Sequence, residues 1–226
     1  MPFEFEQVSG TVAELHAGSA GLVAGPLSGR VARAYQPVDR AVVLGSGQPE
    51  DCVDPEACVA AGTQVVRRRS GGGAVLVEPG GLVWVDLVVP SRDPMWCADV
   101  GQAAWWVGEA WAAALSRSGL PGAQVWKGPM RRREWSSLVC FAGLAGGEVT
   151  GPGGSKLVGI SQRRTRYGSL FQCACLLCWE PSELLGLLRL APAARARAAA
   201  ELSAVASGAG LDKHDEILAH LVGALP

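Results

Sequence analysis

The order of apolar segments predicts an α+β domain, a largely antiparallel sheet flanked by helices. Short apolar runs that stop at glycine or proline fill the chain before residue 180, whereas periodic alanine- and leucine-rich segments follow it. Strands first and helices late are typical of this class rather than of alternating parallel units. No repeat or long linker divides the chain, so we expect residues 1–226 to form one domain.

The strands are predicted from runs of apolar, β-branched or alternating residues. The turn Glu78-Pro79-Gly80-Gly81 separates two such runs and predicts a hairpin. The expected strands are 41–45, 62–68, 74–77, 82–89, 139–142, 156–162 and 169–177.

The helices are predicted from capping residues and helical spacing. Asp99 and Gln102 have the spacing of a capping box, and an apolar pattern of helical period then continues as far as Gly119. The segment 182–226 is expected to be a helical tail containing helices at 184–190, 193–206 and 217–225.

Composition disfavours several classes of protein. The net charge is −1 and apolar residues make up 49% of the chain, which suits a buried core but gives no general attraction to nucleic acid. No apolar run reaches the roughly 18 residues of a membrane span. The first residues lack the basic start and apolar middle of a secretory signal, so we expect a cytoplasmic protein.

The seven cysteines are expected to be reduced thiols, as is usual in a cytoplasmic chain of this size. Cys173, Cys175 and Cys178 resemble a zinc-ligand spacing. However, Cys173 and Cys175 fall in a predicted buried strand, where cysteine behaves as a small apolar residue, and no second ligand pair is nearby. We therefore expect no metal site.

A glycine-rich segment, Arg69-Ser70-Gly71-Gly72-Gly73, lies between two predicted strands. Its uncovered backbone N–H groups could receive an anionic or carbonyl-bearing ligand, and the arginines 67–69 supply planar donors. Considered alone, it is more typical of a turn with solvated arginines. It lacks the spacing of a P-loop or of a dinucleotide-binding turn.

Two further segments contain candidate catalytic residues. A glycine-rich turn precedes Lys156 at the start of a predicted strand, where its ammonium could hold a carboxylate, phosphate or acyl carbonyl or could simply be exposed. Cys140 lies in an apolar stretch, which is usually structural. A catalytic cysteine would need nearby cations or backbone donors.

These segments together resemble the lipoate–protein ligase and octanoyltransferase family. The run RRRSGGGAVLVEPGGLVWVDLVVP resembles its first signature, and KLVGISQRRTRYGSLFQCACLL resembles its second. SSLVCF, followed by GEV, is similar to the cysteine-dependent octanoyltransferase branch, and AVVLGSGQPEDCVD resembles a weaker segment that would put Gly45 and Gln48 near the ligand. The resemblance covers about residues 30–190.

The resemblance implies the α+β fold shared with biotin–protein ligases and the attachment of an octanoyl or lipoyl group to a lysine of a carrier domain. By the match, Cys140 would be the nucleophile, and Lys156 would hold the acyl carbonyl or the phosphate of an adenylate. The residues implied to bind substrate are Arg69, Ser70, Gly71, Gly72, Gly73, Ala74, Gly159, Ser161 and Gln162.

The sequence departs from the family pattern in several places. Where many relatives have a His-Gly pair in the strand after the second signature, this chain has Phe171-Gln172-Cys173-Ala174-Cys175. The usual Asn-Asp before the lysine has no clear counterpart. The N-terminal helix is reduced around residues 12–16, and the small C-terminal domain of many ATP-dependent ligases is missing.

Three functions therefore remain open. Acyl transfer through a Cys140 thioester would need no cofactor and would take an acyl carrier protein as a possible donor. ATP-dependent ligation through an acyl-adenylate would need ATP and Mg²⁺. A non-catalytic relative would only bind an acyl ligand or a partner. The cluster Arg131–Arg133 is expected to dock the acidic face of a carrier protein rather than nucleic acid or membrane.

Overall fold

The computed structural model describes the backbone of residues 1–226 and every side chain except that of Leu211. Its centre is a seven-stranded sheet with the strand order β1-β2-β6-β10-β9-β8-β7. In this sheet β1 and β2 run parallel, and the other neighbouring pairs are antiparallel. The predicted α+β class with a largely antiparallel sheet is confirmed. The strands are β1 (Phe3–Gly10), β2 (Arg30–Pro37), β6 (Leu82–Pro90), β7 (Gln124–Val125), β8 (Val149–Thr150), β9 (Lys156–Arg164) and β10 (Gly168–Leu176).

A second, three-stranded sheet has the order β4-β3-β5 and consists of β3 (Ala41–Leu44), β4 (Gln64–Arg67) and β5 (Val75–Val77). The predicted hairpin of 74–77 with 82–89 is wrong, because β5 and β6 belong to different sheets. The tight turn is present, with the Gly81 N–H donating to Glu78 O at 3.1 Å. However, β6 is buried on both faces and therefore needs a central position in the larger sheet.

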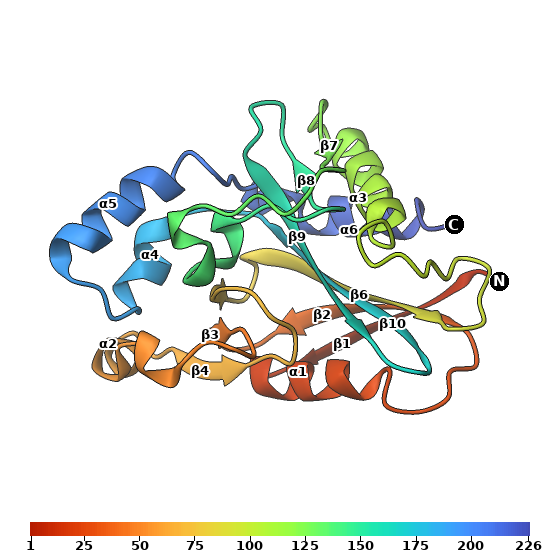
Figure 1. Cartoon of the computed structure of the whole chain (residues 1–226), viewed down its shortest axis with the longest axis horizontal. Helices are drawn as coiled ribbons and strands as arrows, with labels where there is room; N and C mark the ends of the chain where they lie inside the picture. The colour runs from red at the N-terminus through yellow and green to blue at the C-terminus, as the bar shows by residue number, and fades with distance from the viewer.

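The helices lie on both faces of the large sheet (Figure 1). α3 and α6 pack on one face, and α1 and the three-stranded sheet lie against the other. No described helix is long and apolar enough to cross a membrane. The helices are α1 (Val12–Gly21), α2 (Pro55–Ala60), α3 (Trp105–Arg117), α4 (Pro181–Gly186), α5 (Pro192–Leu202) and α6 (His214–Val222), with 3₁₀ turns η1 (Glu50–Cys52), η2 (Glu134–Ser137), η3 (Cys140–Ala142) and η4 (Leu211–Lys213).

Several further predicted elements differ from the observed ones. The helix expected at 184–190 ends at Gly186, and the one expected at 193–206 ends at Leu202. The helix expected to begin near Asp99 begins at Trp105. The Asp99 carboxylate instead closes a preceding turn by accepting from the Gly101 N–H and the Gln102 amide at 2.8 and 2.9 Å. The strand expected at 139–142 is the turn η3, because only Val139 pairs with a neighbour, Ala74, in a single bridge.

Side-chain alternation in the central strands determines which residues face the space between the two sheets. Val83, Val85, Cys173 and Cys175 point into the core under α3 and α6. Their neighbours along the strands therefore face the smaller sheet. Cys178 lies after β10 and is exposed, so the three cysteines of the zinc-like spacing do not share one environment.

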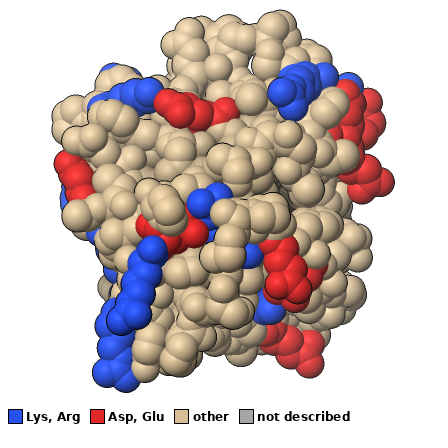
Figure 2. Space-filling view, turned by 90° about the vertical axis from the view of Figure 1, so that its right-hand side faces the viewer, with Lys and Arg blue, Asp and Glu red and all other residues tan. Residues whose placement is uncertain are grey.

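Charged side chains of both signs are scattered over the face shown in Figure 2, which is mostly formed by other residues. A nucleic-acid-binding surface would instead show a continuous basic patch or stripe. This face gives no support to such a role.

Candidate active site

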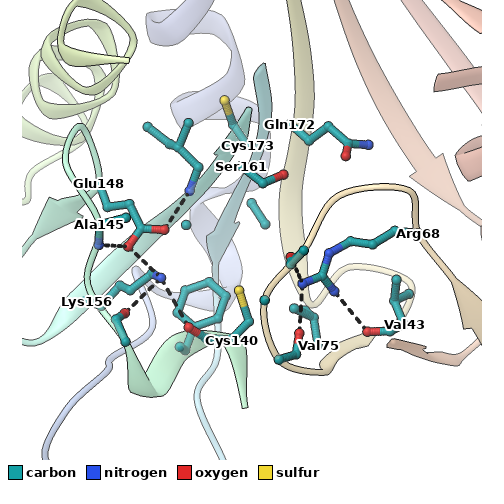
Figure 3. A pocket seen from close by; sticks show the side chains of 18 of the residues that line it. Val43, Arg68, Val75, Cys140, Ala145, Glu148, Lys156, Ser161, Gln172 and Cys173 are labelled. Atoms are coloured by element: carbon teal, nitrogen blue, oxygen red, sulfur yellow. Dashed lines mark hydrogen bonds and ion pairs between the residues drawn. The ribbon is translucent and has the colours of Figure 1, made fainter. Parts of the chain in front are cut away.

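A cavity of about 220 Å³ lies between the two sheets. Its lining combines the segments that the sequence singled out, although they are far apart along the chain. The glycine loop after β4 forms one wall, and the start of β9 and the turn η3 form the other (Figure 3). Of the predicted site residues, those in the lining are Gly71, Gly72, Gly73, Cys140, Lys156, Gly159 and Ser161.

The remaining predicted residues lie outside this lining. Ser70 is buried beside the cavity and accepts a hydrogen bond from Ser161 Oγ at 3.1 Å. Ala74 is fully buried, and its carbonyl accepts from the Cys140 N–H at 3.0 Å. Arg69 is exposed and does not line the cavity. Gln162 follows Ser161 on β9 and therefore points to the opposite sheet face.

Gly45 and Gln48 support the loop from behind and do not line the cavity. The Gln48 side chain accepts from the Gly45 N–H at 3.0 Å and donates to Ser137 O and Leu138 O at 3.1 Å. This residue thereby joins the end of β3 to the turn that precedes Cys140.

Arg68 is the arginine that organises the glycine loop. Its buried guanidinium donates to Val43 O at 3.1 Å, Gly71 O at 2.7 Å and Gly73 O at 2.8 Å. Burial lowers the pKa of Arg68, and the ionisable thiol of Cys140 nearby opposes part of this shift. Arg69 rather than Arg68 was expected at the site, although the first signature begins with two arginines, which correspond here to Arg67 and Arg68.

The glycines allow this loop to approach the Cys140 segment closely. A Cβ on Gly73 would lie 2.6 Å from the Val139 backbone, so no larger residue fits there. Gly72 has a φ of 96°, in the left-handed region that favours glycine. The position of a Gly72 Cβ lies 3.0 Å from Arg68 Nη2 and 3.8 Å from Cys140 Sγ. Arg68 and Cys140 therefore flank the same point of the loop.

Lys156 forms a buried ion pair with Glu148 at the other side of the cavity (Figure 3). Its Nζ lies 2.8 Å from Glu148 Oε2 and donates to Gly143 O at 3.1 Å and to Cys140 O at 3.3 Å. These three contacts use all three donors of the ammonium. Glu148 is the Glu of the GEV motif, but the sequence did not reveal that it would hold the lysine.

Cys140 is half-buried in the turn η3, between Arg68 on one side of the cavity and Lys156 on the other. Its carbonyl is bound by Lys156, and its side chain points into the cavity beside the glycine loop (Figure 3). The thiol therefore lies on the cavity wall between the Arg68 guanidinium and the Lys156 ammonium, where an incoming acyl group could reach it.

The opposite end of the cavity contains residues that the sequence did not indicate as functional. His16 of α1 stacks on Trp84 of β6, with ring centroids 4.4 Å apart. Burial, together with the charge of Arg68, lowers the pKa of His16 to about 4, so its imidazole is neutral near pH 7. No sequence signal connects residue 16 with this site, because the contact depends on the packing of α1.

A hydrogen-bonded chain of polar side chains connects this end to the glycine loop. Ser70 Oγ donates to Gln172 Oε1 at 2.9 Å, and Gln172 Nε2 donates to Ser19 Oγ at 2.8 Å. Ser19 in turn donates to the fully buried carboxylate of Asp86. Gln172 occupies the stretch where relatives have His-Gly, and here it fixes the loop to β10.

The fold and the cavity agree with the protein family that the sequence resembles. The family model described as the lipoyl protein ligase A/B catalytic domain matches residues 23–209, somewhat more than the expected 30–190. The chain therefore belongs to this enzyme family. No curated protein sequence matches the chain.

Solved structures show the same fold. The bipartite lipoate protein ligase of Thermoplasma acidophilum aligns with a TM-score of 0.75 at 20% identity, over 99% of this chain and 82% of that one. A lipoate-protein ligase A bound with ATP aligns with a TM-score of 0.72 at 21% identity, over 99% and 84%. A lipoate-bound protein of P. falciparum aligns with a TM-score of 0.67 at 12% identity, over 99% and 61%.

Proposed function

We propose that this enzyme transfers an octanoyl or lipoyl group to a lysine of a lipoyl carrier domain through a thioester on Cys140. The observation that carries the proposal is the position of the Cys140 thiol, which lines the cavity between Arg68 and Lys156. A structural cysteine would instead be enclosed by apolar side chains away from the cavity, as Cys175 is.

The proposed reaction has two balanced steps. The Cys140 thiolate attacks the carbonyl carbon of an acyl thioester, a new C–S bond forms, and the donor thiolate leaves and takes up a proton. The neutral amine of the acceptor lysine then attacks the Cys140 thioester. The amide bond forms as the C–S bond breaks, and the amine gives up its proton as the Cys140 thiol is restored.

Lys156 is proposed to stabilise the oxyanion of both steps. Its ammonium donors are all engaged, and the longest contact is the one to Cys140 O at 3.3 Å. A substrate carbonyl could replace that contact, while the Glu148 carboxylate holds the lysine in place. The glycine loop, with Gly71 and Gly72 exposed, would receive the remainder of the acyl head group.

ATP-dependent ligation is the second candidate, and the ATP-bound relative favours it. The open glycine loop and Lys156 could face the phosphate of an acyl-adenylate. Glu148 is the one carboxylate in the cavity lining and is already paired with Lys156. A Mg²⁺ ion would therefore be held mainly by the phosphates of the nucleotide.

Intact-mass analysis separates the two candidates. After incubation with octanoyl acyl carrier protein, we expect an octanoyl adduct on Cys140 that hydroxylamine removes. Cys140→Ser should form no such thioester and should lose transfer by roughly 10⁴-fold or more. The buried Cys175, which does not line the cavity, gives the matched thiol control, and Cys175→Ser should retain the adduct. Octanoate- and ATP-dependent modification that survives the loss of Cys140 would favour ligation instead.

The carrier protein is proposed to dock at Arg131–Arg133. All three arginines are exposed, and Met130 and Ser136 on either side line the cavity, so the cluster lies at its rim. The Arg131 guanidinium lies over the Trp126 ring at 4.3 Å, which holds it in one orientation. The T. acidophilum structure belongs to a lipoylation system of a bipartite lipoate protein ligase and its E2 lipoyl domain, which supports a carrier domain as the partner here.

Charge reversal tests this docking site. Arg132→Glu should raise the apparent KM for the carrier protein by about tenfold at low salt, with little change in kcat, because rim charges act mainly on association. The exposed Arg117→Glu at the end of α3 is the control and should leave KM unchanged. Equal effects of both reversals would contradict a local docking site.

A further inference from the structure

The cavity continues away from Cys140 along one row of residues that crosses the large sheet. The strand register pairs Gly159 of β9 with Ala174 of β10, and Ala174 with Trp84 of β6. All three residues line the cavity. A Cβ on Gly159 would lie 3.4 Å from both Lys156 Cε and Phe141 Cζ, so Gly159 marks the reactive end of the row.

The middle of the row is a narrow apolar channel. Gly159 and Ala174 have the smallest side chains of the floor, and they leave free space above the sheet. Val75 and Val77 of β5 face them from the smaller sheet and also line the cavity. A channel with a small apolar floor and an apolar roof suits an extended alkyl chain, which gains free energy by leaving water.

The far end of the row is closed by the stacked rings of Trp84 and His16. Tyr35 packs against Trp84 with ring centroids 4.4 Å apart, and the Trp84 indole N–H donates to Asp86 at 3.2 Å. These contacts fix the position of the end wall. Because the His16 imidazole is neutral near pH 7, the wall presents no charge to a hydrocarbon end.

The distance from Gly159 to Trp84 sets the length of the acyl chain that the channel can hold. Gly159 and Trp84 lie two strands apart, which is roughly 10 Å at the usual spacing of strands in a sheet. An extended alkyl chain advances by roughly 1.3 Å per carbon, given C–C bonds of about 1.5 Å. The channel therefore accommodates about eight carbons between the reactive end and the wall.

We infer that Ala174 and His16 determine acyl-chain length, Ala174 by the depth of the channel floor and His16 by the position of its end wall. The inference rests on the proposed function, since it takes the cavity to be an acyl site. It assigns selectivity for an unbranched acyl group of medium length to two residues, neither of which takes part in the chemistry.

Calorimetric titration of the full chain with straight-chain fatty acids, from butanoic to dodecanoic, tests the inference. The unmodified protein should bind octanoic acid best, with a loss of roughly fourfold in affinity for each methylene removed. Ala174→Leu should shift the optimum to shorter acids, because the larger side chain fills the channel. His16→Ala should shift it to longer acids.

Two matched controls accompany these variants. His16→Phe keeps an aromatic ring against Trp84 and should not shift the optimum to longer acids. Ala17→Leu changes the exposed neighbour of His16 on the same helix and should have no effect. The two test variants should shift the optimum in opposite directions. General damage to the fold would not produce opposite shifts, so the two variants are compared with each other.

The outcomes separate this inference from the function on which it rests. A length optimum that neither Ala174→Leu nor His16→Ala moves would overturn the inference and leave the acyl site in place. Failure of the unmodified protein to bind any of the acids, with no acyl adduct on Cys140, would instead overturn the proposed function.

Discussion

Glu148 and Asp86 are buried carboxylates in different surroundings. Glu148 lies beside Lys156 at the reactive end of the cavity, and Asp86 lies behind the wall that closes the other end. Glu148 is 4% exposed and Asp86 is fully buried, so both have lost nearly all of their hydration. A carboxylate in such surroundings needs either a cation or a set of hydrogen-bond donors, or it takes up a proton. Glu148 is paired with a cation at the reactive end, whereas Asp86 is surrounded by hydrogen-bond donors behind the end wall.

At the reactive end, a cation compensates the charge. Glu148 Oε2 lies 2.8 Å from Lys156 Nζ and accepts from the Ala145 N–H at 2.7 Å, while Oε1 accepts from the Ile160 N–H at 3.0 Å. Every partner is a backbone donor or a full positive charge. These contacts fix the carboxylate in place, and it can hold the lysine in the position proposed for binding the reacting carbonyl.

Behind the end wall, the donors are neutral. Asp86 accepts hydrogen bonds from Ser19, from the Tyr35 hydroxyl at 3.0 Å and from the Trp84 indole at 3.2 Å. Burial raises the pKa of Asp86 to about 6, although these hydrogen bonds act in the opposite direction. Asp86 is therefore a titrating group within the working range of a protein, and it braces the wall rather than taking part in chemistry.

Removal of the charge of Glu148 is expected to have the larger effect. Glu148→Gln leaves the Lys156 ammonium buried without a counter-charge, which should lower the free energy of unfolding by about 3–5 kcal/mol. Lys156→Met should cost a comparable amount, because it leaves the carboxylate unpaired. The double variant Glu148→Gln/Lys156→Met should cost clearly less than the two single changes together.

Urea unfolding of the four proteins gives the required free energies. Additive losses would show that the two groups do not stabilise each other and would remove the contrast with Asp86. The transfer assay adds a second readout, since the double variant should regain stability without regaining activity.

The sequence predicted the parts of this comparison that depend on local pattern. Apolar runs predicted the strands β6, β9 and β10, and sequence motifs predicted the glycine loop, Cys140 and Lys156 as parts of the site. The charged and alternating start of the chain gave no clear signal for β1, an edge strand with only one neighbour.

The remaining contacts join segments that are far apart along the chain. His16 meets Trp84, and Ser19 meets Gln172 across 153 positions, so neither pairing follows from spacing or composition. Asp86 was visible as a single acid within an otherwise apolar strand, which indicates a buried polar group. Its partners, however, are fixed only by the packing of α1 and β2 on β6.

Replacement of Asp86 is expected to have a smaller effect that depends on pH. The folded protein retains a proton on Asp86 up to about pH 6, whereas an unfolded chain releases it near pH 3.8. The stability that comes from this proton is fully present below about pH 4 and is lost as the pH rises to 6 and above. A shift of about two pH units corresponds to about 3 kcal/mol.

Asp86→Asn abolishes this titration, because an amide does not ionise. The variant should carry a fixed cost of about 1–3 kcal/mol, since its NH₂ group must face one of the three donors that the carboxylate accepted. Between pH 4 and pH 7, the free energy of unfolding of Asp86→Asn should then rise by about 3 kcal/mol relative to that of the unmodified protein. Urea unfolding of both proteins at pH 4, 5, 6 and 7 measures this difference, in which the other titrating groups cancel. If the difference in free energy of unfolding stayed constant with pH, Asp86 would not titrate in this range. The proposed contrast between Asp86 and Glu148 would then be wrong.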